Sequence, residues 1–100
     1  MTRSTRTAAP ATSRYLAECF WPGVREPDVE AAAARLARGV ASGGSDPELA
    51  CEGWILAAGD EVVFFLFRAT SGESVRRVCE QAAIGAERVI EVRATVAGGR

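Results

Sequence analysis

The sequence predicts a single α+β domain whose elements follow the order strand, helix, strand, strand, helix, strand. Two segments have apolar residues at helical spacing, and four others are rich in aromatic and β-branched residues. Turn-forming residues separate these segments. The chain has 100 residues, the length of one domain, and 48% of them are hydrophobic, which is enough to form a core.

The first strand is expected at residues 14–21, where RYLAECFW ends at the turn signal Pro22-Gly23. A helix is expected at residues 27–40, since Pro27 suits the first helical position. Its apolar residues share one face: Val29, Ala33, Leu36 and Val40. This part of the chain therefore predicts a strand followed by an amphipathic helix.

Residues 51–58 and 61–69 are expected to form the second and third strands, joined as a hairpin by Gly59-Asp60. The third strand contains the run VVFFLF, six apolar residues without the alternation of a half-exposed strand. Both of its faces should therefore be covered.

A second helix is expected after Thr70, because Thr70 and Glu73 have the spacing of a capping box, and Gly85 is placed to end it. The last strand is expected at about residues 88–96. This order is that of the ferredoxin-like fold, a four-stranded antiparallel sheet with two helices on one face. In that fold the first and third strands are central, which agrees with their apolar character.

The domain is expected to span residues 14–96. Residues 1–13 should form a disordered N-terminal tail, and residues 97–100 a loose C-terminal one. Two helices cover only one face of the sheet, and each large apolar side chain left in water forgoes about 1.5–3 kcal/mol. A second copy of the chain would cover the other face most simply, giving an α/β dimeric barrel with a cavity between the sheets. A ligand, another protein or the N-terminal tail are the alternatives.

The composition excludes several chemistries. The chain has no His, Lys or Asn, and all twelve basic residues are Arg, so a general acid or base must be Asp, Glu, Cys or Tyr. A net charge of −1 without a basic run argues against binding of nucleic acid. The sequence has no apolar stretch of about 18 residues, so it predicts no membrane span. The three cysteines lack CxxC spacing, which fits neither a disulfide framework nor a zinc site and favours a cytoplasmic location.

Three segments together resemble a bacterial domain-of-unknown-function family of small ferredoxin-like, nickel-binding-protein-like proteins: RYLAECFWPGV, FFLFRATSGESVRRVCEQAAI and ERVIEV. The resemblance aligns Glu18 and Glu91 with the family's glutamates in the first and last strands. It places Cys79 where relatives often carry His or Asn, and Phe65 where a Cys is common. Metal binding in the family relies on His, so this chain is expected to need no cofactor, and Cys79 is the one candidate for a metal ligand.

The candidate catalytic residues are Glu18 and Glu91. They should lie on neighbouring strands, on the face away from the helices, where a pair of carboxylates in a dimer cavity could serve general acid–base chemistry. The alternative is that they form ion pairs with Arg93 or Arg14.

The candidate ligand-binding residues are Tyr15, Trp54, Phe65 and Arg93, which could line a cavity for a small apolar or aromatic ligand. Packing in the core or the interface is the alternative for the aromatic residues. Arg68, at the end of the third strand, could hold an anion or could simply be solvated. The sequence thus predicts a small-ligand-binding protein, with a cofactor-free isomerase, cyclase or monooxygenase using the same cavity as the alternative.

Overall fold

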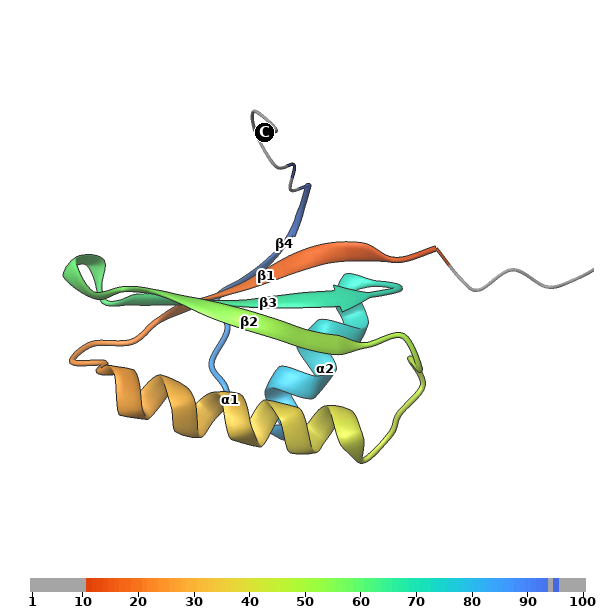
Figure 1. The fold of residues 1–100 in the computed structure, drawn as a ribbon, viewed down its shortest axis with the longest axis horizontal. Coiled ribbons are helices and arrows are strands. Elements are labelled where there is room, and N and C mark those ends of the chain that lie inside the picture. The colour runs from red at the N-terminus through yellow and green to blue at the C-terminus, as the bar shows by residue number, and fades with distance from the viewer. Residues whose placement is uncertain (1–10, 94, 96–100) are drawn as a thin grey trace, which may run out of the picture.

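The computed structural model describes residues 11–93 and 95 (Figure 1). Its elements are β1 (Ser13–Phe20), α1 (Glu26–Ala41), β2 (Ala50–Ala57), the 3₁₀ turn η2 (Ala58–Asp60), β3 (Val62–Ala69), α2 (Gly72–Gln81) and β4 (Arg88–Val92). The predicted order of strands and helices is therefore confirmed.

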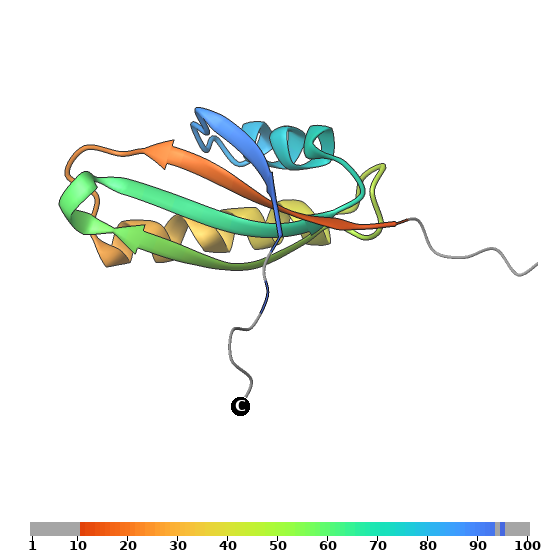
Figure 2. The ribbon, with the colours of Figure 1, turned by 90° about the horizontal axis from the view of Figure 1, so that it is seen from above.

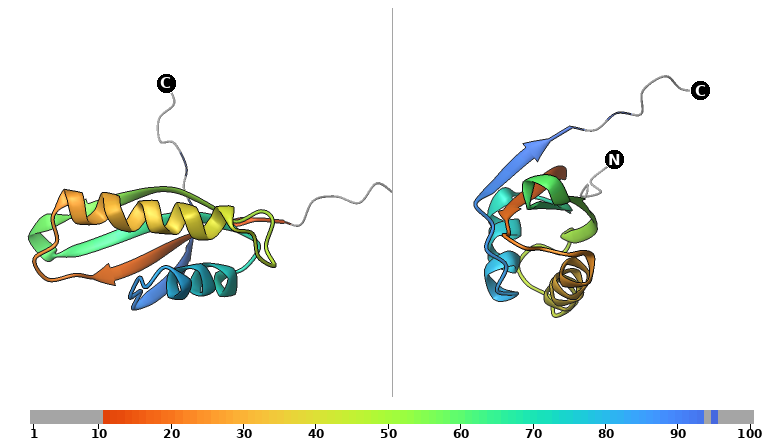
Figure 3. Two further views of the ribbon diagram at one scale, coloured as in Figure 1. Left: turned by 90° about the horizontal axis from the view of Figure 1, so that it is seen from below. Right: turned by 90° about the vertical axis from the view of Figure 1, so that its left-hand side faces the viewer.

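The four strands form one antiparallel sheet in the order β2-β3-β1-β4, with β3 and β1 in the centre. Both helices lie on the same side of this sheet, as the views from below and from the end show (Figure 3). The opposite side faces the viewer in Figure 2 and is covered by neither helix. The predicted ferredoxin-like fold is confirmed.

The core lies between the sheet and the two helices. Phe65 and Phe67 of β3 have no exposed surface there, and Val29 and Leu36 of α1 and Val75 of α2 pack in the same cluster. β3 is therefore a fully buried strand on its helix side. Its other side carries equally apolar residues, which the helices do not reach.

The two helices begin with different caps. The backbone N–H of Arg25 donates to the carboxylate of Asp28 at 2.9 Å, and Pro27 occupies the first turn of α1. The predicted capping box of α2 at Thr70 is wrong by one residue. Ser71 is the cap, and its hydroxyl accepts a hydrogen bond from the backbone N–H of Ser74 at 3.3 Å.

Several predicted boundaries also differ. The helix α2 ends at Gln81, and Ala83, with φ 59°, takes the left-handed conformation expected of Gly85. The β2–β3 connection is a 3₁₀ turn, followed by Glu61 at φ 56°. β4 ends at Val92, and β1 already begins at Ser13, which the sequence assigns to the N-terminal tail.

Residues 1–10 and 97–100 of the predicted tails lie outside the described residues, as do positions 94 and 96 of the predicted last strand. In the part of the chain that the structure describes, neither helix combines the length and the apolar character needed to cross a membrane.

Candidate functional site

The side of the sheet opposite the helices, called the open face below, is the main functional candidate. Neighbours along a strand point to opposite sides, and directly paired residues of adjacent strands point to the same side. Because Ala17 and Cys19 of β1 are buried under the helices, Leu16, Glu18 and Phe20 face the other way. The pairing register then gives the large apolar residues of the open face: Leu16, Phe20, Ile55, Val62, Phe64, Leu66, Ile90 and Val92.

These residues form the apolar rows of the open face, which run across the sheet and are interrupted by Glu18 and Arg88 in the row of Ile55 and Phe64. Leu66, Leu16 and Ile90 are paired side by side on β3, β1 and β4. Phe20 and Ile55 each keep 56% of their surface exposed, the largest exposed hydrophobic residues in the described chain. A contiguous apolar surface of this kind marks an interaction site rather than an ordinary solvent-facing surface.

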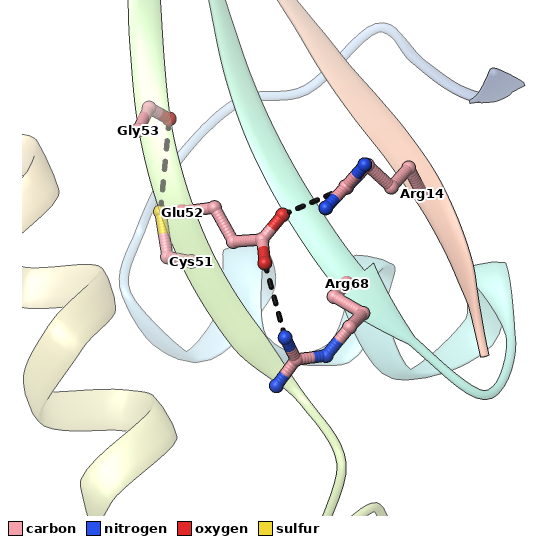
Figure 4. Close-up of polar contacts among 5 residues, drawn as sticks. All are labelled: Arg14, Cys51, Glu52, Gly53 and Arg68. Atoms are coloured by element: carbon pink, nitrogen blue, oxygen red, sulfur yellow. Dashed lines mark hydrogen bonds and ion pairs between the residues drawn. The ribbon is translucent and has the colours of Figure 1, made fainter. Parts of the chain in front are cut away.

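Charged residues border the apolar rows at one end. Glu52 lies between two arginines on the open face (Figure 4). Its carboxylate accepts a hydrogen bond from Arg14 Nε at 3.0 Å and another from Arg68 Nη1 at 3.1 Å. Both guanidinium groups remain nearly half exposed, so they can also reach a further partner.

A bulge in β2 places Glu52 there. Cys51 pairs with Phe67 and Gly53 pairs with Leu66, so Glu52 is the extra residue between them. Bulges re-aim side chains at functional sites, and Gly53 has the φ of 156° that glycine adopts readily. Without the bulge, Glu52 itself would sit opposite Leu66 in the apolar row.

Glu18 also lies on the open face, in the row that contains Phe64. Its carboxylate accepts a hydrogen bond from Arg88 Nε at 2.6 Å, across the β1–β4 pair. Glu18 therefore forms an ion pair, but the predicted partners Arg14 and Arg93 are wrong, and Arg88 is the partner.

A depression of about 370 Å³ lies at the arginine end of the sheet. Arg14, Arg68, Glu91 and Arg93 are among the residues that line it. It lies at the end of the strands, where Glu52 holds two of these arginines. A volume of several hundred cubic ångströms is in the range of small-molecule sites.

Glu91 does not share the open face with Glu18, and that prediction is wrong. Glu91 pairs with Tyr15, whose side chain is buried on the helix side, so Glu91 belongs to the helix side of β4. Glu18 pairs with Arg88, and both belong to the open face. Because side chains alternate, a shift of one residue sends a side chain to the other face. The two carboxylates are therefore not a pair within one cavity.

The three predicted aromatic ligand residues also lie on the helix side. Tyr15 is 9% exposed, Phe65 is 0% exposed, and Trp54 is paired with Phe65 and packs against the core. Their placement favours the core-packing alternative and keeps them away from a cavity between two sheets. Arg93 is exposed just beyond β4, where it lines the depression.

The sequence reasoning missed Glu52 and Arg88. Glu52 is followed by Gly53, and a glycine inside a strand pattern is a signal for a bulge that could have drawn attention to it. Arg88 carries no such signal, because its partner is distant in the sequence. Only the β1–β4 register brings it to Glu18.

The cysteines do not fit a nickel site. Burial, with help from the carboxylates of Glu87 and Glu18, raises the pKa of Cys19 to about 11. Burial also raises the pKa of Cys79 to about 12 and that of Cys51 above its ordinary value. Metal ligation needs the thiolate, which these environments disfavour.

The carboxylates do not supply the missing ligands. Within residues 11–93 and 95, no three His, Cys, Asp or Glu side chains gather closely enough to hold a metal ion. Cys79, the one candidate metal ligand, is buried in the core between the sheet and the helices.

Comparison with protein-family models and with curated proteins finds no match to the sequence. Among solved structures, the fold is similar to that of SCO4226 from Streptomyces coelicolor A3(2), with a TM-score of 0.70. The alignment covers 84% of this chain and 100% of that chain, at 16% sequence identity. A similarity at this level of identity shows that both chains have the same ferredoxin-like fold.

Proposed function

We propose that this protein binds a small apolar molecule as a homodimer, in which two copies pack open face to open face and enclose the ligand. The observation that carries the proposal is the contiguous apolar surface of the open face, with Phe20 and Ile55 each 56% exposed. Full burial of such a side chain from water is worth about 1.5–3 kcal/mol, of which covering the exposed 56% would supply roughly half.

The size of the open face supports a second copy as its cover. Three of the four strands have eight residues. With a spacing of about 4.8 Å between strands and about 3.4 Å between residues, the face measures roughly 19 by 27 Å, or about 500 Å². Two such faces supply about 1,000 Å², the lower bound for a specific interface.

The character of the open face supports both parts of the proposal. An apolar face is complementary to itself, as a twofold symmetric interface requires. Among the residues of the four described strands, charged groups interrupt it at Glu18 and Arg88 and at the Arg14–Glu52–Arg68 end. An apolar surface with a few fixed polar groups is the usual composition of a small-molecule site.

The first test is the mass in solution, measured by light scattering after size exclusion. We expect twice the chain mass of 10.6 kDa for the wild type and a folded monomer for Ile55→Glu. Ile55 is largely exposed in the single chain, so this change should destabilise the interface and leave the core intact. Ala37→Glu, on the exposed side of α1, is the matched control and should remain a dimer.

The second test uses N-phenyl-1-naphthylamine, a neutral apolar probe that fluoresces when it leaves water. The wild type and Ala37→Glu should bind it saturably, and Ile55→Glu should not. A monomeric wild type would overturn the homodimer. In that case something other than a second copy covers the open face, such as the N-terminal segment or a different protein. A dimer without saturable binding would overturn the ligand-binding function.

A further inference from the structure

The arginine end of the open face carries more positive than negative charge. Arg14 and Arg68 flank a single carboxylate, that of Glu52. Arg93 and Glu91 line the adjoining depression and add one charge of each sign. The cluster therefore has one positive charge in excess, which the described residues that line it do not balance.

Both guanidinium groups keep donors for another anion. An arginine has five N–H donors, and the bonds to Glu52 use Nε of Arg14 and Nη1 of Arg68. The two side chains remain 46% and 44% exposed, and both line the depression of about 370 Å³. Two arginines held in place by a shared carboxylate suit a planar anion such as a carboxylate.

The apolar rows begin directly beside this cluster. Leu66 and Leu16 lie two residues along the strands from Arg68 and Arg14, and Phe64 lies two residues farther. The successive apolar rows follow one another along the strands. At about 3.4 Å per residue, they cover roughly 20 Å from the arginines to the far end of the strands. A ligand can thus place a charged head at the arginines and an apolar body along the rows.

We infer that the ligand is an amphipathic monocarboxylic acid, with its carboxylate between Arg14 and Arg68 and its alkyl or aromatic body on the apolar rows. This inference rests on the proposed ligand-binding function and adds the class of the ligand and the residues that recognise its head. The surplus of one positive charge matches a monoanion, and the length of the rows limits its body to about 20 Å.

The test compares octanoate with 1-octanol, which have the same chain length but differ in charge, by calorimetric titration of the dimer. The wild type should bind octanoate at least tenfold more tightly than 1-octanol. Arg68→Gln and, independently, Arg14→Gln should weaken octanoate binding about tenfold or more and leave 1-octanol unchanged, because a hydrogen bond to a charged group is lost. Arg76→Gln, on the exposed face of α2, is the matched control.

Glu52→Gln tests the same electrostatics with the opposite sign. It removes the negative charge beside both arginines but keeps a carbonyl oxygen that can still accept a hydrogen bond and position them, so octanoate should bind more tightly, and this gain should shrink at high salt. Unchanged or weaker octanoate binding in this variant would contradict the inference, as would equal wild-type affinities for octanoate and 1-octanol. In the latter case the apolar ligand function survives, whereas binding of neither molecule by a dimer would overturn both proposals.

Discussion

The carboxylate of Asp46, in the loop after α1, accepts several hydrogen bonds. Its carboxylate accepts the backbone N–H of Thr70 at 2.9 Å and that of Glu48 at 3.0 Å. Partial burial would favour the neutral acid, but these bonds and the hydroxyls of Ser74 and Thr70 outweigh it. They hold the pKa of Asp46 below its ordinary value of 3.8. One side chain thus ties the loop to the first turn of α2.

Replacing Asp46 with Asn should lower the free energy of unfolding by about 1–2 kcal/mol at pH 7, because charge-assisted bonds become neutral ones. A pKa lowered in the folded state stabilises the fold above the unfolded-state pKa, and this contribution is lost as pH falls through the folded value. The difference between wild type and variant in urea denaturation should therefore shrink between pH 5 and pH 2. Asp60→Asn, at the exposed end of η2, is the control, and a pH-independent difference would contradict the role of charge.

At the scale of elements, the two helices approach closely where α1 carries a glycine. A Cβ atom added at Gly39 would lie 2.9 Å from Cγ2 of Val78, which is buried on α2. Valine in a helix has one strongly preferred rotamer, so its methyl group cannot easily turn away. The absence of a side chain at Gly39 therefore sets the distance between the helices.

Gly39→Ala should destabilise the protein by about 1–2 kcal/mol, although alanine favours an isolated helix by about 1 kcal/mol, since overpacking outweighs propensity. In a Val78→Ala background the methyl group is gone, and the same change should be neutral or stabilising. Urea denaturation of the four proteins in this double-mutant cycle measures the coupling. Equal effects of Gly39→Ala in both backgrounds would show that contact with Val78 does not restrict the size of the side chain at position 39.

At the scale of the whole molecule, the sheet is covered by helices on one side only. The open face is apolar along much of β3, whose core side contains Phe65 and Phe67, and charged residues interrupt the open face at Glu18 and Arg88. A 100-residue domain has a modest margin of stability, so burial of this second face should matter to the stability of the fold.

If a second copy provides that burial, the melting temperature must depend on concentration, because association stabilises the folded state by mass action. We expect the wild-type melting temperature to rise by about 5–10 °C over a hundredfold increase in concentration. Ile55→Glu should show no such dependence. Scanning calorimetry checks this, and a wild-type melting temperature independent of concentration would contradict the dimer.

The local pattern of the sequence was sufficient to predict the order of the elements and the central position of β1 and β3. These signals are local: apolar periodicity, proline near the start of α1 and the unbroken apolar run at residues 62–67. Each spans only a few residues, so it can be recognised in the sequence without the fold. The same run correctly indicated that the second face of the sheet is apolar.

The tertiary structure decided which charged side chains meet. The β1–β4 register brings Arg88 to Glu18 and sends Glu91 to the helix side, and the bulge in β2 presents Glu52 to two arginines. Strand pairing joins residues far apart in the sequence, and a shift of one position reverses the face of every side chain. Local patterns therefore determined the elements, whereas the candidate site depended on a register that only the folded sheet fixes.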